Sequence, residues 1–445
     1  MTEVAYTTKA KPVAGLAETK AMPLSAQWLR QTVLDAGAAD VGFVSVSRPE
    51  VDVDRDDIVS AFPRARTLVS FVCDMNPDAI RTPARSVANL EFHHTGDHVN
   101  DVARHVVKAL RGQGYRGINP AMGFPMEMDR FPSGKLWVVS HKKIAEAAGL
   151  GKMGIHRNII HPKLGNFVLL GTIITDAEVA EESKPIDYNP CFECKLCVAA
   201  CPVGAIKPDG AFDFSGCYTH NYREFMGGFT DWVEQVADSK SARDYRGRVT
   251  DAESASMWQS LSFGANYKAA YCMAVCPAGE NIIGSYEQSK KQFKQEVLKP
   301  LQLKEEPVYV VPNSDGEAHV RKRFKNKTVR RIGSGLRANT IAGFLSGVSL
   351  LFQRGVAKKL GLDATYQFTF TGAEPTKATI VIRNGALLVR PGHEGEATVR
   401  ITADSKTWLD LLAKNRGMFG AVITGKLRVK GPLKLMRQFQ RCFPS

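Results

Sequence analysis

Seven of the nine cysteines lie between Cys191 and Cys276, at spacings that are typical of iron–sulfur ligands. The stretch CFECKLCVAACP, residues 191–202, has the pattern C-x2-C-x2-C-x3-C-P. In bacterial ferredoxins the first three thiolates of this run bind one [4Fe–4S] cluster, and the fourth binds a second cluster. A zinc site needs only four sulfur ligands, so zinc leaves the second half of the motif, which ends in proline, unexplained. The pattern therefore predicts two iron–sulfur clusters.

The stretch YKAAYCMAVCPAGE, residues 267–280, contains the end of a second motif, C-x3-C-P. Crossed ligation predicts that cluster one is held by four thiolates and cluster two by three. The expected ligands of cluster one are Cys191, Cys194, Cys197 and Cys276, and those of cluster two are Cys201, Cys217 and Cys272. The remaining ligand of cluster two would belong at residue 269, which is alanine.

Three interpretations of this gap are open. The second cluster is [3Fe–4S]; or it is [4Fe–4S] with a fourth ligand other than cysteine, such as water, His220 or another nearby oxygen; or the second site is empty. We favour an occupied site, because Cys201, Cys217 and Cys272 would otherwise have no role. Three thiolates give a cluster less negative charge than four, which raises its reduction potential.

The composition is that of a globular protein, with 44% apolar and 23% charged residues in a chain of 445. No apolar run is long enough to span a membrane, and the N-terminus lacks the apolar core of a signal peptide. We therefore expect a cytoplasmic protein. In that compartment clustered cysteines indicate metal binding rather than disulfides.

The net charge is +14, and eleven Lys and Arg residues against two acidic ones fall between residues 315 and 360. We expect a solvated basic linker, or a segment that contacts anionic lipid head groups or an acidic redox partner at the periphery of a membrane. Nucleic acid is an unlikely partner, because aromatic residues do not alternate with these charges in a binding pattern.

Helical and strand patterns alternate between residues 24 and 186, which predicts an α/β domain. Within it, residues 144–176 read IAEAAGLGKMGIHRNIIHPKLGNFVLLGTIITD, and the ferredoxin run follows about 15 residues later. This order resembles the epoxyqueuosine reductase and reductive dehalogenase superfamily. The resemblance implies a nitroreductase-like core that binds cobalamin base-off, beside two clusters that deliver electrons to cobalt.

The same resemblance implies which residues surround the corrinoid and supply a proton. The Gly-rich loop would run alongside the corrinoid, since glycine permits close backbone approach. The candidate cofactor-binding residues are Lys142, Gly149, Gly151, Met153, Gly154 and His156. Tyr115 and His141 are the candidate catalytic residues, although each is also typical of a structural position.

Two departures from the superfamily stand out. One is Ala269, where a cysteine is usual. The other is the stretch KLWVVSHKK, residues 135–143, which has no carboxylate where queuosine enzymes carry an aspartate. Both the proton donor and a tRNA substrate are therefore in doubt.

The last 110 residues contain strand-like stretches separated by turns, among them YQFTFTG, residues 366–372, and ATIVIRNGALLV, residues 378–389. With GKLRVKGPLKLMRQF, residues 425–439, they resemble the sterol carrier protein 2 domain. That resemblance implies a five-stranded α+β fold with an apolar tunnel for lipids. The alternative is an ordinary α+β domain whose apolar residues are all core.

We expect five segments in a multidomain α/β and α+β chain. They are an N-terminal extension (1–23), a nitroreductase-like core (24–186), a ferredoxin-like two-cluster domain (187–289), a basic linker (290–334) and an SCP2-like lipid-binding domain (335–445). The predicted function is a corrinoid-dependent reductase of an apolar or lipid-like substrate, supplied with electrons by reduced ferredoxin or flavodoxin. The alternative is a corrinoid-free electron carrier or redox sensor with a lipid-binding domain.

Overall fold

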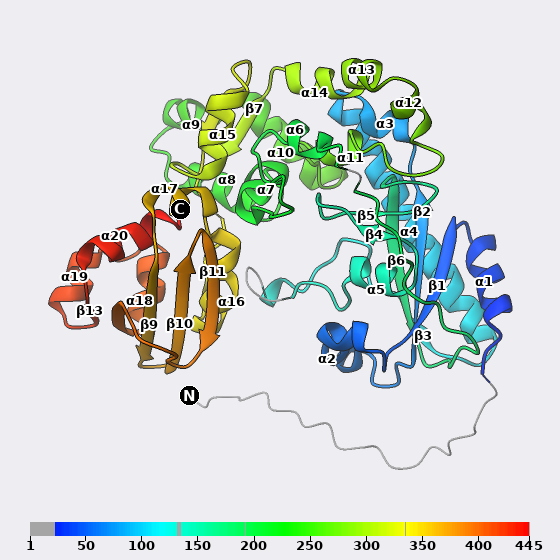
Figure 1. Ribbon diagram of the computed structural model, residues 1–445, viewed down its shortest axis with the longest axis horizontal. Coiled ribbons are helices and arrows are strands. Elements are labelled where there is room, and N and C mark those ends of the chain that lie inside the picture. Colours follow the sequence, from blue (N-terminus) through cyan, green and yellow to red (C-terminus); the bar gives the residue numbers. More distant parts are fainter. Residues whose placement is uncertain (1–22, 131–134, 192, 334, 445) are drawn as a thin grey trace, which may run out of the picture.

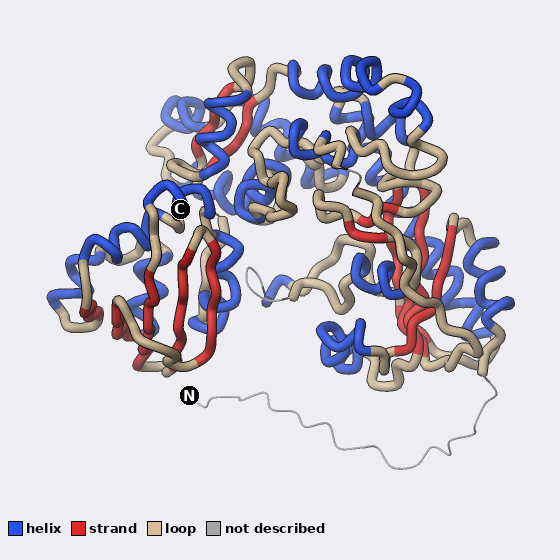
Figure 2. The backbone as a smooth tube through the Cα atoms, viewed as in Figure 1, coloured by secondary structure: helices blue, strands red, loops and turns tan. Residues whose placement is uncertain are grey.

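The computed structural model describes residues 23–130, 135–191, 193–333 and 335–444. The expected N-terminal extension, apart from Pro23, lies outside these ranges. Two sheets stand on opposite sides of the molecule, and a mostly helical region joins them along one side (Figures 1 and 2). Within the described residues, the structure has no helix that is both long and apolar enough to cross a membrane.

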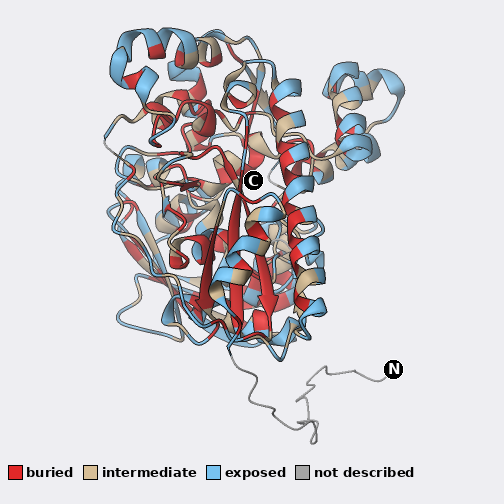
Figure 3. Cartoon of the chain, turned by 90° about the vertical axis from the view of Figure 1, so that its right-hand side faces the viewer, coloured by how far each residue is buried: buried red, intermediate tan, exposed pale blue. Residues whose placement is uncertain are grey.

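The core domain is built on an antiparallel sheet with the strand order β1-β2-β6-β3. Helix α4 (Arg85–Gly112) covers one face with α1 (Ala26–Asp35), and α5 (His141–Ala147) covers the other with α2 (Asp52–Ala61). Figure 3 shows the sheet as a buried layer behind helices with exposed outer faces. The strands are Asp40–Ser45, Thr67–Asp74, Gly117–Ile118 and Val168–Thr175.

Local sequence explains where these elements begin and which face they bury. The Ser25 side chain accepts a hydrogen bond from the Trp28 backbone N–H, which caps α1. Helix α4 buries apolar side chains three or four residues apart, so that one stripe faces the sheet. Its buried apolar residues include Phe92, Val99, Val102, Val106 and Leu110. Cys73 is fully buried in β2, as its apolar surroundings in the sequence predict.

The cysteine-rich region consists of short helices joined by loops. Helix α10 begins with a capping box, in which the side chains of Thr250 and Glu253 each accept a hydrogen bond from the other's backbone. The helices are α6 (Leu196–Ala200), α7 (Phe214–Asn221), α8 (Gly227–Ala237), α9 (Ala242–Arg248), α10 (Asp251–Phe263) and α11 (Tyr271–Ala274).

Residues 290–333 differ from the solvated linker that their charge predicts. They form α13 (Lys290–Phe293), a π-helical turn (Lys294–Leu298), α14 (Lys299–Leu303), β7 (Pro307–Val310), α15 (Asp315–Arg323) and β8 (Thr328–Arg331), after α12 (Gly284–Gln288). Their apolar side chains belong to the same core as the cysteine-rich helices. Several cations are used internally, including Lys327 with Glu306 at 2.7 Å and Arg331 with Glu317 at 2.7 Å.

The C-terminal domain has a five-stranded sheet in the order β11-β10-β9-β12-β13. Strands β9 and β12 pair in parallel, and the other neighbours are antiparallel. The strands are β9 (Ala364–Thr371), β10 (Thr376–Arg383), β11 (Ala386–Pro391), β12 (Val399–Asp404) and β13 (Leu427–Lys430). The helices are α16 (Ile341–Leu351), α17 (Arg354–Leu360), α18 (Ser405–Leu412), α19 (Met418–Ile423) and α20 (Leu433–Arg441). The predicted mixture of α/β and α+β domains is therefore confirmed.

Candidate iron–sulfur centres and cofactor cavity

The four thiols expected to hold cluster one line the same small cleft. They are Cys191, Cys194, Cys197 and Cys276. The backbone N–H of Ile155 donates a hydrogen bond to Cys191 Sγ at 3.4 Å. Burial and then the neighbouring cysteines raise the pKa of the Cys197 thiol. Such a group favours a bound cation, because a positive centre offsets the cost of burying several thiolates.

The three thiols expected to hold cluster two, Cys201, Cys217 and Cys272, line a different and larger cavity of about 790 Å³. The backbone N–H of Ala205 donates to Cys201 Sγ at 3.2 Å. Among the described residues, no three His, Cys, Asp or Glu side chains gather closely enough to hold a single metal ion. The motif spacing, together with three thiols that share one cavity, fits a multinuclear cluster.

The two halves of the ferredoxin motif have the same local backbone. Lys195 precedes α6 with φ 51° and ψ 21°, and Ala270 precedes α11 with φ 54° and ψ 23°. Both residues lie in the left-handed region, which non-glycine residues seldom adopt. This correspondence places Ala269 where the first half has Cys194. The alanine therefore occupies a ligand position of an otherwise intact motif.

The segment around Ala269 is held firmly by the chain. Asn221 Oδ1 accepts hydrogen bonds from the backbone N–H groups of Ala269 and Ala270, both at 3.0 Å. Ala269 is buried and lines the large cavity. His220 lies one turn after Cys217 on α7, lines the same cavity, and has a buried Nε2 with no partner. Burial lowers the pKa of His220 to about 4, so its imidazole is neutral near pH 7.

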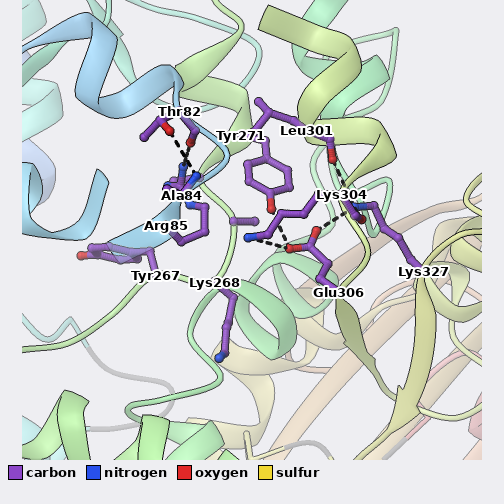
Figure 4. Close-up of polar contacts among 12 residues, drawn as sticks. Thr82, Ala84, Arg85, Tyr267, Lys268, Tyr271, Leu301, Lys304, Glu306 and Lys327 are labelled. Carbon is purple, nitrogen blue, oxygen red and sulfur yellow. Dashed lines mark hydrogen bonds and ion pairs between the residues drawn. The ribbon is translucent and has the colours of Figure 1, made fainter. Parts of the chain in front are cut away.

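Residues 301–327 belong to the segment that the sequence predicts to be a linker. Hydrogen bonds and an ion pair to the Glu306 carboxylate pack this segment against the loop that carries Cys272 (Figure 4). Tyr271 donates a hydrogen bond to Glu306 Oε2 at 2.7 Å, and Lys327 Nζ donates to Glu306 Oε1 at 2.7 Å. Burial opposes the charge on Glu306, but Lys327 outweighs it and, with the hydrogen bond from Tyr271, lowers the pKa of the carboxyl. The Arg85 guanidinium lies 5.3 Å from the centroid of the Tyr271 ring. Residues 301–327 are therefore part of the framework of the second cysteine group.

Two predicted cofactor-binding residues line the large cavity. Lys142 Nζ donates to the backbone carbonyl of Arg157 at 2.6 Å and to Asn158 Oδ1 at 2.9 Å. Surrounding protein lowers the pKa of the Lys142 ammonium, and Cys272 and Cys217 oppose that shift. His156 lines both cysteine cavities, and its Nδ1 accepts from the Asn158 N–H at 3.1 Å. Its buried Nε2 has no partner, so the ring presents an unused N–H donor.

The Gly-rich loop is positioned by other parts of the chain. A Cβ at Gly149 would lie 2.4 Å from the Lys184 carbonyl oxygen, and one at Gly151 would lie 2.4 Å from that of Ile160. A Cβ at Gly154 would meet the side chains of Ile160 and His156. The Met153 N–H donates to Glu146 Oε1 at 2.8 Å. None of these four residues is among the described residues that line the large cavity, so close chain packing accounts for the glycines.

The two predicted catalytic residues also lie outside the described lining of the cavity. His141 is buried, with Nδ1 2.9 Å from Thr172 Oγ1 and Nε2 3.0 Å from the Ala121 carbonyl oxygen. Both ring nitrogens are thus used inside the core, and burial lowers the pKa of His141. Tyr115 packs against the core below α4. Tyr222 and Tyr267, which no sequence motif singles out as catalytic, line the cavity instead.

A second cavity, of about 930 Å³, lies in the C-terminal domain, against α8. Its walls are mainly apolar, with Phe344, Val348, Leu412 and Phe439 among them. Trp408 also lines it, and the buried Nε1 of this side chain has no hydrogen-bond partner. Helix α16 separates the two cavities, because Leu350 lines both.

Comparisons with known proteins agree with this arrangement. Residues 184–207 match the 4Fe-4S binding domain, and residues 355–444 match the SCP-2 sterol transfer family. An epoxyqueuosine reductase from Gloeobacter violaceus is 27% identical over 199 residues, which are 43% of this chain and 59% of that enzyme. One from Synechococcus sp. is 35% identical over 81 residues, which are 17% and 23% of the respective chains.

This chain is similar to epoxyqueuosine reductases. The predicted resemblance is confirmed: this is an iron–sulfur protein related to oxidoreductases. The chain spans 23% of the Synechococcus relative and 59% of the Gloeobacter one.

Solved structures were also found. An epoxyqueuosine reductase with an epoxyqueuosine-modified tRNA stem loop is 16% identical, covering 75% of this chain and 84% of that one with a TM-score of 0.35. A catabolic reductive dehalogenase in complex with 3-bromo-4-hydroxybenzoic acid is 14% identical, covering 61% and 37% with a TM-score of 0.38. The prediction that nucleic acid is an unlikely partner stays a prediction.

Proposed function

We propose that this protein is an iron–sulfur reductase that holds a corrinoid, base-off, in the large cavity and reduces an apolar, lipid-like substrate. One observation carries the proposal. A single cavity of about 790 Å³ joins Cys201, Cys217 and Cys272 to the core domain and to helix α16 of the C-terminal domain. Its size and its largely apolar and aromatic walls are those of a cofactor site.

The residues present fit a large ring-shaped cofactor beside a cluster. Lys142, His156 and Asn158 would hold its polar edge, since His156 offers a buried and unused donor. Phe212, Tyr222 and other aromatic residues would pack against its faces. When bound, the corrinoid supplies a strongly reducing and nucleophilic cobalt centre, and the protein supplies orientation and a dry environment.

The proton donor we propose is Tyr222, in place of Tyr115 and His141. Tyr222 lies in the cavity, and burial followed by the charges of nearby Cys217 raises the pKa of its phenol well above the ordinary value. The hydroxyl therefore keeps its proton near neutral pH. The raised pKa keeps the proton on the phenol but makes it a weaker acid, so we propose Tyr222 for its position in the cavity.

The apolar substrate is supported by the cavity beyond α16. Trp408 and Phe344 line a space of about 930 Å³ that shares Leu350 with the cofactor cavity. A lipid-like molecule held there needs to pass only one helix to approach the cysteines. Reduced ferredoxin or flavodoxin as electron donor is consistent with the net charge of +14, which favours an acidic partner.

A second candidate function is a corrinoid-free electron carrier with a lipid-binding domain. Two observations favour it. Ala269 leaves a ligand position without a thiol, and residues 135–143, which begin with Lys135, lack the carboxylate that queuosine enzymes carry there. Lys135 is committed to an ion pair with Asp54 at 2.6 Å.

Equilibrium dialysis of cluster-replete protein with cobalamin distinguishes the two. The reductase binds cobalamin, with the absorption spectrum of the base-off form, and Lys142→Met weakens that binding. Lys143→Met is the matched control, because Lys143 is an exposed neighbour on the same helix that is not among the residues lining the cavity. Absence of binding to cluster-replete protein would favour the carrier.

A further inference from the structure

The outer surface of the C-terminal domain combines exposed apolar side chains with a strong positive charge. On α19, Phe419 is 80% exposed and Ile423 is 68% exposed, and Leu433 at the start of α20 is 66% exposed. Such large apolar side chains in a group usually mark an interaction site. Figure 1 shows α19, β13 and α20 at the outer edge of the molecule, away from the core domain.

The charge around this group has one sign. From residue 411 to the end of the chain there are eight Lys and Arg residues and no Asp or Glu. Six of these cations are exposed on β13, on α20 or directly before β13: Lys426, Arg428, Lys430, Lys434, Arg437 and Arg441. None of the six forms an ion pair among the described residues. We call this surface, with Phe419, Val422, Ile423 and Leu433 at its centre, the α19–α20 face.

The α19–α20 face lies at one end of the apolar cavity. Met418, the first residue of α19, lines the cavity of about 930 Å³ and is 38% exposed. Gln440 on α20 also lines it, and its Nε2 lies 3.6 Å from Met418 Sδ, which links the two helices at this point. A ligand that enters between α19 and α20 would pass directly from a partner bound on this face into the cavity.

We propose that the α19–α20 face docks on an anionic lipid bilayer, from which apolar ligands enter the cavity. Cations bind the anionic head groups, while the side chains of Phe419 and Ile423 enter the interface below them. An RNA ligand explains the charge but not four exposed apolar side chains, three of them aliphatic, next to an apolar cavity. An acidic protein gives no reason for the cavity to open here.

The charge pattern of the chain predicts membrane contact at residues 290–334, and the α19–α20 face is a second candidate surface for such contact. Cations in that segment are ion-paired to Glu253, Glu306 and Glu317, so less of their charge is available to lipids. Docking at the α19–α20 face does not depend on the corrinoid, since the face belongs to the C-terminal domain and the cavity behind it is lined by that domain and by α8.

The test is co-sedimentation of the full-length protein with vesicles of phosphatidylcholine and phosphatidylglycerol, and with vesicles of phosphatidylcholine alone. We expect binding to the anionic vesicles that weakens with added salt. Lys426→Gln/Lys430→Gln/Lys434→Gln should lose about fivefold in affinity for each cation removed. Phe419→Ser/Ile423→Ser should also lose binding at unchanged charge.

Matched controls remove the same groups elsewhere. Lys291→Gln/Lys294→Gln/Lys299→Gln removes three exposed cations from the opposite part of the chain, and Val53→Ser/Leu303→Ser removes two exposed apolar side chains. Both should bind vesicles like the wild type. The proposal is wrong if wild type ignores anionic vesicles, if the controls lose as much binding as the face variants, or if a tRNA stem loop binds the face and phosphatidylglycerol vesicles do not compete.

Discussion

Cys272 and Cys276 are separated by one turn of chain around α11, yet they line different cavities. Cys272 faces the large cavity with Cys201 and Cys217, whereas Cys276 faces the small cleft with Cys191, Cys194 and Cys197. The chain thus divides its seven clustered cysteines into a group of four and a group of three, as crossed ligation requires.

Substitution of these two cysteines should therefore affect different clusters. Cys276→Ala should remove or degrade the cluster of the four-thiol group and leave the other signal in place, and Cys272→Ala should do the reverse. Electron paramagnetic resonance of each reduced variant checks this, with Cys73→Ala as the control outside both groups. Loss of the same signal in both variants would contradict the division.

Glu306 should stabilise the fold through its buried partners. Glu306→Gln leaves Lys327, whose side chain is 1% exposed, without its carboxylate, and should cost about 3 kcal/mol. Urea unfolding at neutral pH measures this difference. Glu305→Gln, at the exposed neighbouring position, should change stability by less than about 0.5 kcal/mol.

The stability difference between wild type and Glu306→Gln should also depend on pH, and the pKa shift of Glu306 determines the sign of that dependence. The folded-state pKa of Glu306 is lowered from its ordinary value of 4.5, so its contribution is complete above that value and is lost as the pH falls through the folded-state pKa. The stability difference between wild type and Glu306→Gln should therefore shrink on acidification below about 4.5. A difference that grows with acidification would show that the carboxylate is not stabilised as described.

Trp408 should select lipids that carry a hydrogen-bond acceptor. Its Nε1 lies unpartnered in the wall of the apolar cavity, so a hydroxyl or carbonyl oxygen of the ligand can accept from it. Trp408→Phe should weaken the binding of a long-chain alcohol by about tenfold or less and leave a hydrocarbon of equal length nearly unaffected. A ligand-displacement assay that does not use tryptophan fluorescence measures both affinities. Substitution of the exposed Trp258, Trp258→Phe, is the control.

Substitutions of Tyr222 and Tyr115 distinguish the proton donor that we propose from the one that the sequence predicts. Once a reducible substrate is found, Tyr222→Phe should lower kcat by about 10²-fold or more, because general acid catalysis contributes on that scale. Tyr115→Phe should change kcat little. Equal losses in the two variants would indicate a structural effect.

Much of this arrangement could be predicted from sequence, because the information was local. The cysteine spacing determines which thiols group together, and the alternation of strand residues around 366–389 determines a sheet. The role of residues 290–333 could not be predicted, since Glu306 and Lys327 act through contacts with Tyr271 that no local pattern contains. Whether the glycines of the 149–154 loop face a ligand could not be predicted either, because a glycine needed for close approach has the same pattern whether it faces a ligand or the carbonyl of Lys184.

The most direct test of the account is an iron count combined with electron paramagnetic resonance on wild type and Ala269→Cys. Three thiolates at the second site predict about seven to eight irons, with a [3Fe–4S] signal after mild oxidation that Ala269→Cys suppresses. The substitution should also lower the potential of that cluster, because it adds a thiolate at the position that matches Cys194. About eight irons with no such signal would indicate that another group already holds the fourth iron. A count near four that reconstitution leaves unchanged would contradict the account, because the second cysteine group would then hold no cluster.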